Sequence, residues 1–249
     1  MDIRLPRPIH GWRQFFGEVG IIVLGVLIAL GAEQLMSDGH DRNVAADTRA
    51  AVRDEINDGL ASIALRGQAE PCIDRRLAEL REIFADWSRN GAFTTPRWVA
   101  QAPTLEVTLA RYDAALAAGR IALLPSEEQY QMGAIAAQIR EFERIQEDQH
   151  LVWGRLRALQ AGPEMLSQSD RTMLLTALQE ASTLNHLAKL HVRQALPLAK
   201  SHGFEPDFQR IRATARNVWT NGRYSPTICT PIDTHPDQAN KTQVVPLPL

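Results

Sequence analysis

The sequence predicts an all-α fold: an N-terminal transmembrane helix, then an antiparallel helical bundle, then an extended proline-rich C-terminal tail. Three observations support this. A charge-free apolar run fills residues 19–32, and apolar residues recur at helical spacing through most of the chain that follows. Prolines then interrupt the last segment; they lie at positions 226, 231, 236, 246 and 248.

The apolar run needs its flanks to cross a bilayer. A spanning helix takes about 20 residues, because the hydrocarbon core is about 30 Å thick and each residue rises about 1.5 Å. Phe15 to Met36 is long enough, and Trp12 suits an aromatic belt at the first interface. We therefore expect a transmembrane helix over 12–36, after a basic leader over 1–11.

The flanking charges predict an orientation. Arg4, Arg7 and Arg13 precede the helix, whereas Asp38 and Asp41 follow it. The positive-inside rule then places the N-terminus in the cytoplasm and the bulk of the chain in the periplasm of a bacterial inner membrane. The lipid bilayer is the predicted partner.

Two other interpretations of the apolar segment stay open. Ala29-Leu30-Gly31 fits a small-x-small signal-peptide cleavage site, although Glu18 borders the apolar core and no helix breaker precedes the cut. A buried helix of a soluble domain is the third interpretation. Within a membrane, the spacing of Gly25 and Ala29 would favour helix–helix contact and a homo-oligomer.

Residues 37–219 are predicted to form the helical domain, a bundle of four to six helices. A helix over 43–68 either continues from the membrane or is separated by a break at 37–39, and Pro71 ends or kinks it. A second helix ends at Asn90-Gly91. A loop over 91–103 follows. The next helix is expected over 104–118, and another is expected to begin at Ser126.

Start and stop signals define the later helices. Ser126 and Gln129 match a capping box, and Ser167 with Asp170 at N3 matches the cap of another helix. Both helices carry long apolar stripes, interrupted by Gln149 in the first, which is expected to help fix register. Gly162-Pro163 and Gly203 are the stops, Pro197 kinks the last turn, and a short helix follows over about 206–219.

The tail over 220–249 should be extended, either packed on the domain or mobile. Cys72 and Cys229 are the only cysteines. An oxidising periplasm favours a disulfide between them, which would tie the tail to the second helix. Two free thiols are the alternative.

Side chains that resemble catalytic or binding sites have simpler interpretations. Glu143, Glu147 and His150 share one helix face, and Glu-x-x-His is a spacing of di-iron bundles. That face lies away from the apolar stripe, so a solvated charged face is favoured over a metal site. His191 falls on an apolar stripe and reads as a core histidine. Six arginines in two clusters could bind an anion, but we expect them to be exposed side chains that keep the surface soluble. They are Arg75, Arg76, Arg81, Arg210, Arg212 and Arg216.

Composition excludes some function classes. The net charge of −2 over 249 residues gives no general attraction to nucleic acid. The sequence contains no phosphate-binding loop, dinucleotide fingerprint or nucleophile elbow. We therefore predict no cofactor and no nucleic-acid partner, and an enzyme is not the favoured interpretation.

The N-terminus carries a resemblance. Trp12-Arg13-Gln14-Phe15-Phe16-Gly17-Glu18, with Ile22 to Leu30 and Ala32-Glu33-Gln34, resembles the opening of a group of uncharacterised Gram-negative single-pass inner-membrane proteins. The similarity extends loosely past Pro71-Cys72. Because that group has no established activity, it implies topology and fold but no catalytic residue.

These observations leave three hypotheses for function. The first is a non-enzymatic, membrane-anchored scaffold or interaction module that binds an envelope protein of unknown identity. The second is a ligand-sensing bundle that signals through a partner, since no second transmembrane segment follows. The third, a metal-dependent enzyme or hydrolase, has the least support.

Overall fold

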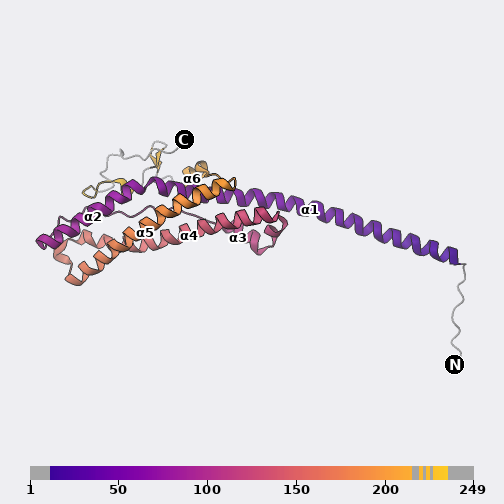
Figure 1. Cartoon of the computed structure of the whole chain (residues 1–249), viewed down its shortest axis with the longest axis horizontal. Helices are drawn as coiled ribbons and strands as arrows, with labels where there is room; N and C mark the ends of the chain where they lie inside the picture. Colours follow the sequence, from indigo (N-terminus) through magenta and orange to yellow (C-terminus); the bar gives the residue numbers. More distant parts are fainter. Residues whose placement is uncertain (1–11, 215–218, 221–222, 225–226, 235–249) are drawn as a thin grey trace, which may run out of the picture.

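The computed structural model of the protein describes residues 12–214, 219–220, 223–224 and 227–234 (Figure 1). The fold class is the predicted one, all-α with a long apolar N-terminal helix. The α-helices are α1 (Trp12–Gln68), α2 (Glu70–Asn90), α3 (Ala110–Ala117), α4 (Ser126–Leu156), α5 (Gln168–Ser201) and α6 (Phe208–Thr214). Short 3₁₀ turns are η1 (Arg120–Leu123), η2 (Arg157–Ala161), η3 (Pro163–Met165) and η5 (Thr227–Cys229), and a two-residue antiparallel pair joins β1 (Trp219–Thr220) to β2 (Arg223–Tyr224).

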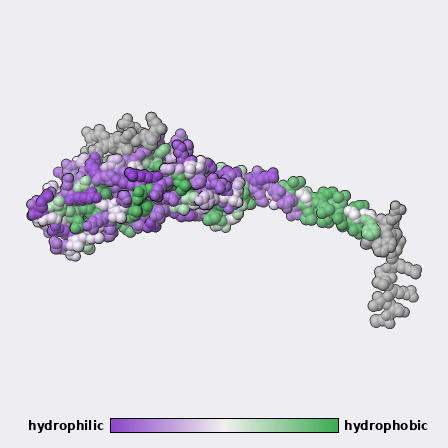
Figure 2. All heavy atoms as spheres, viewed as in Figure 1, coloured by the Kyte–Doolittle hydropathy of each residue, from purple (hydrophilic) through white to green (hydrophobic). Residues whose placement is uncertain are grey.

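Helix α1 is continuous over 57 residues, so residues 37–39 form no break. Its first half projects from the bundle, and Figure 2 shows the apolar stretch within this projecting part. The described side chains of this stretch are exposed. By length and composition α1 is able to cross a membrane.

The second half of α1 lies in the core of the bundle. Ile56, Leu60 and Ile63 are fully buried and pack with residues of α4 and α5. A second cluster fills the far end, where Leu77, Leu80 and other α2 residues meet Trp153 of α4. The apolar stripes predicted for the two longest bundle helices are the surfaces that make these contacts.

Helix α3 begins later than its sequence predicts. The predicted start near Thr104 is wrong, because residues 101–109 are not helical. The side-chain amide of Gln146 bonds both the N–H (2.7 Å) and the C=O (3.1 Å) of Leu105, which holds this segment extended. The helix starts where the Glu55 carboxylate accepts hydrogen bonds from the backbone N–H groups of Arg111 and Tyr112.

Of the two predicted capping boxes, one is present. Ser167 accepts from the N–H of Asp170, and the Asp170 carboxylate accepts from Ser167 in return. The box predicted at Ser126 is wrong: Ser126 is already helical after Pro125, and the Gln129 side chain donates instead to the Leu124 carbonyl at 2.8 Å.

After α5, helix α6 packs back on α1, and η5 packs on α2. Gly203 has φ of +72°, the left-handed conformation that ends the helix, and Pro197 lies inside the last turns. The helix predicted over 206–219 starts at Phe208 instead and is described as far as Thr214, while residue 219 lies in β1. Residues 227–234 lie against the loop after α2. The leader over 1–11, the side chains of Arg210 and Arg216 and the tail beyond Thr234 lie outside the described residues.

Candidate functional site

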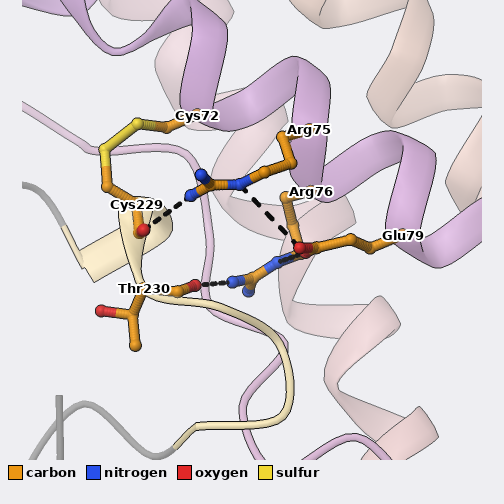
Figure 3. The surroundings of a disulfide bond; sticks show 6 residues. All are labelled: Cys72, Arg75, Arg76, Glu79, Cys229 and Thr230. Carbon is orange, nitrogen blue, oxygen red and sulfur yellow. Dashed lines mark hydrogen bonds and ion pairs between the residues drawn. A yellow bond between two sulfur atoms is a disulfide. The ribbon is translucent and has the colours of Figure 1, made fainter. Parts of the chain in front are cut away.

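The first candidate site is where the tail meets α2 (Figure 3). Cys72, in the first turn of α2, is joined to Cys229 of η5 with an S–S distance of 2.02 Å and a sequence separation of 157. Cys229 is buried and Cys72 is half-buried. The pair that the sequence analysis favoured is therefore at bonding distance, and it ties residues 227–234 to the bundle.

Arg76 completes this junction, and we call Arg76 with its partners the clasp. Its side chain is fully buried. It donates to the carbonyls of Trp98 and Val99 in the loop after α2, and to the carbonyl of Thr230 in the tail. Glu79 supplies the countercharge at 2.7 Å. One guanidinium thus joins three segments that are distant in sequence.

The burial of Arg76 contradicts the prediction that the helix arginines are exposed. Burial lowers the pKa of Arg76 below its ordinary value, and the hydrogen bond that Arg76 donates to Glu79 opposes that shift. A buried cation is tolerated because its N–H groups meet carbonyl and carboxylate oxygens. Neighbouring Arg75 stays half-exposed and donates to the Cys229 carbonyl at 2.6 Å.

A second buried polar cluster joins four helices around Arg66. The Arg66 guanidinium donates to the Asn185 side chain at 2.8 Å and, at the long limit of 3.5 Å, to Gln149. Asn185 donates in turn to Asp74, which also pairs with Lys189. Gln149, expected to help fix register, lies in this cluster of α1, α2, α4 and α5.

Arg66 and Asn185 are not among the candidate residues named from the sequence, although a signal for each is present there. Arg66 follows Ile63 by three residues, so it continues the buried face of α1. Asn185 lies four residues after Ala181 and three before Ala188 on the α5 stripe. Polar residues at two such core positions indicate a buried polar contact.

The weak metal candidates are placed on an exposed surface. Glu143, Glu147 and His150 are all solvent-exposed on α4. Beside them Arg144 pairs with both Glu141 (2.5 Å) and Asp148 (3.4 Å), so this face carries mixed charges. Across the described ranges, no group of three His, Cys, Asp or Glu side chains is placed to hold a metal ion.

His191 lies in the core, as its place on the stripe predicted. It is buried, and its ring stacks on Phe142 with centroids 6.2 Å apart. Burial lowers the pKa of His191, while the backbone of Gln138 and the charge of Glu141 partly oppose the shift. The imidazole is therefore held in its neutral form at pH 7.

A shallow groove runs between α4 and α5, with a volume of about 470 Å³. Leu151, Val152 and Leu184 supply apolar lining, and the Arg155–Glu180 ion pair, 2.6 Å long, crosses it. On the adjoining outer face of α5, the fully exposed residues from Gln168 to Leu190 carry no formal charge, and half-exposed Glu180 beside them is paired with Arg155. We call these fully exposed residues the neutral face: Gln168, Ser169, Thr172, Met173, Leu175, Thr176, Gln179, Thr183, His186, Leu187 and Leu190.

The comparisons with known proteins give no family. The chain matches no protein-family model, no curated protein and no solved structure.

Proposed function

We propose that this protein is a non-enzymatic, single-pass membrane scaffold that holds a helical interaction module at a fixed position beside the bilayer. The observation that supports it most is the unbroken α1. Its first half is apolar and exposed, and its second half is packed into the bundle core. A helix shared between membrane and domain transmits position and orientation without a flexible linker.

The proposed location is the inner membrane of a Gram-negative bacterium, with the bundle in the periplasm. Arginines precede the apolar segment and aspartates follow it, which favours a cytoplasmic N-terminus. The Cys72–Cys229 bond fits an oxidising compartment. The resemblance of residues 12–34 to inner-membrane proteins points the same way.

The intact mass of the protein, purified from membranes without reductant, tests this location. We expect the full-length mass, unchanged by alkylation under denaturing conditions because both thiols are bonded. A mass that corresponds to a polypeptide beginning near Ala32 would mean that a signal segment has been cleaved and that the domain is secreted. Full length with two alkylated thiols would contradict the periplasmic placement.

The proposed interaction surface is the neutral face of α5 with the adjoining groove. Charged side chains cover the outer face of α4, where exposed residues include Arg140, Glu141, Glu143, Arg144 and Glu147. Interface cores are depleted in charged residues. The uncharged, leucine-bearing face of α5 is therefore the better candidate for contact with an envelope protein.

Photo-crosslinking in intact cells tests the interaction module. A photoreactive residue would replace Leu187 on the neutral face or, as the matched control, exposed Glu143 on α4. We expect a discrete heteromeric adduct from position 187 and none from position 143. Recovery of the protein alone, or equal adducts from both positions, would count against a scaffold that binds through α5.

A ligand-sensing bundle remains the second candidate, supported by the groove between α4 and α5. At about 470 Å³ its volume is within the range of small-molecule sites, about 300–1,000 Å³. A thermal-shift screen of the full-length protein against small polar and apolar metabolites would favour sensing if one raised the unfolding temperature in proportion to its concentration. Loss of that shift in Leu151→Glu would place the ligand in the groove.

A further inference from the structure

The connection from α3 to α4 differs in composition from the rest of the bundle surface. Residues 114–126, which we call the tip, contain one formally charged side chain, Arg120. Leu116 is 53% exposed and Leu123 is 41% exposed. The small residues between them are also exposed: Ala117, Ala118, Gly119 and Ala122. Exposed leucines on a nearly uncharged loop indicate a surface that meets an apolar or interfacial partner.

The tip lies at the end of the bundle from which α1 leaves toward its N-terminus (Figure 1). Helix α3 starts beside Glu55 and runs back along α1, because Ala118 and Arg120 line the same hollow as Val44 and Asp47. Gly119, with φ of +70°, then reverses the chain into η1. The tip therefore faces the apolar half of α1.

The continuous helix fixes how far the tip stands from the apolar segment. Val44 follows Met36 by eight residues, which is about 12 Å of helix rise. The headgroup layer covers roughly 5–8 Å of that height. A neighbouring helix lies about 8–10 Å off the axis, so a transmembrane tilt of about 20–40° lowers one side of the bundle by several ångströms. Tilt toward the tip in the upper part of that range would close most of the remaining gap of about 4–7 Å.

We propose that the tip rests in the headgroup layer of the bilayer that α1 crosses. Leu116 and Leu123 enter the headgroup layer, and the Arg120 guanidinium meets lipid phosphates. Of the flanking acids, Asp113 and Glu128 are paired with Arg140 and Arg49, which reduces their repulsion from those phosphates, whereas exposed Glu127 accepts a hydrogen bond from the Gln131 side chain. This second contact fixes the tilt of α1 and hence the direction in which the neutral face points. The proposal rests on the membrane anchoring proposed above.

Tryptophan quenching by brominated lipid in nanodiscs tests the contact on the full-length protein. Leu123→Trp reports on the tip, and Leu190→Trp is the matched control, because Leu190 has a similar exposure of 39% but lies on α5 far along the bundle. Spectra of the wild-type protein, which has five tryptophans, are subtracted from each variant. Thermal melts followed by circular dichroism check that both variants keep the fold.

We expect the added tryptophan at position 123 to lose emission in brominated lipid and the one at position 190 to keep it. No quenching at either position, in protein that co-elutes with nanodiscs, would overturn the tip contact and leave the anchor intact. Equal quenching at both positions would also overturn it, because the bundle would then lie flat on the bilayer. Failure to co-elute would instead remove the anchor itself.

Discussion

The two halves of α1 have the same secondary structure but opposite surroundings. Leu24 is 58% exposed in the first half, whereas Leu60 is fully buried in the second. Gly25 has open space around it, whereas a Cβ added to Gly59 would lie 2.8 Å from the Ile139 side chain. The apolar residues of the first half are therefore suited to surroundings other than the protein interior, whereas those of the second half specify one packing arrangement. Four predictions test that difference.

The disulfide gives the largest expected effect, and it should act on the bundle alone. Replacing both cysteines, Cys72→Ser with Cys229→Ser, removes a cross-link that restricts the unfolded chain over a separation of 157 residues, and it should lower the free energy of unfolding by about 4–5 kcal/mol. Urea unfolding in detergent measures the loss. Alkaline extraction of membranes should still leave the variant in the pellet. Extraction of the variant into the supernatant would mean that the folded bundle, and not the apolar half of α1, holds the protein in the membrane.

Truncating a leucine in each half should give unequal results. Leu60→Ala leaves a cavity in the core and should cost about 2–5 kcal/mol. Leu24→Ala removes no protein contact and should stay within about 0.5 kcal/mol in detergent. Urea unfolding curves of the two variants, recorded under one condition, measure the contrast. Equal losses would show that the first half also packs against protein.

The two glycines offer a smaller and sharper contrast. Gly59→Ala forces its methyl group against buried Ile139, an overpacking that costs about 1–3 kcal/mol, less the gain in helix propensity. Gly25→Ala meets no such atom and keeps only that gain. Thermal melts should show a lower midpoint for Gly59→Ala and no lowering of the midpoint for Gly25→Ala. A lower midpoint for Gly25→Ala would indicate close contact at Gly25 with another helix.

The smallest expected effect is a pH dependence of the bundle. Residues 19–32 contain no titratable side chain, whereas His191 is buried in the bundle with a lowered pKa. In the unfolded chain His191 takes up a proton as the pH falls through about 6.5, whereas in the folded protein it stays neutral to a lower pH. The free energy of unfolding is therefore unaffected by this group above about pH 6.5 and falls as the pH drops below it.

His191→Gln removes this titration, so its unfolding free energy should fall less than that of the wild-type protein between pH 7.5 and pH 5.5. Glu70, whose pKa is raised by burial, shifts stability in the opposite sense but is common to both proteins. Parallel losses in the two proteins would mean that His191 does not titrate differently on folding.

Local signals predicted most of the helices. Gly91 and Gly203 end helices with positive φ, and Ser167 with Asp170 forms its box, because each signal acts within a few residues. The apolar stripe of α4 follows from periodicity alone: Met132, Ile135, Ile139, Phe142 and Ile145 are all buried.

Partners distant in sequence decided what was mispredicted. The start of α3 depends on Glu55 and Gln146, and Arg76 is buried by carbonyls of the loop after α2 and of the tail. No local pattern encodes such pairings. The candidate sites followed the same division. The count of two cysteines in an expected oxidising compartment identified the cysteine pair, and helical spacing identified His191, whereas the clasp around Arg76 and the cluster around Arg66 required the fold.

The clasp has a consequence for how the protein is made. Arg76 lies in the second helix, yet one of its acceptors is the Thr230 carbonyl, close to the end of a 249-residue chain. Its burial is therefore incomplete until Thr230, 154 residues later in the chain, has been synthesised and has left the ribosome. The bundle should therefore close last at the end remote from α1's apolar half.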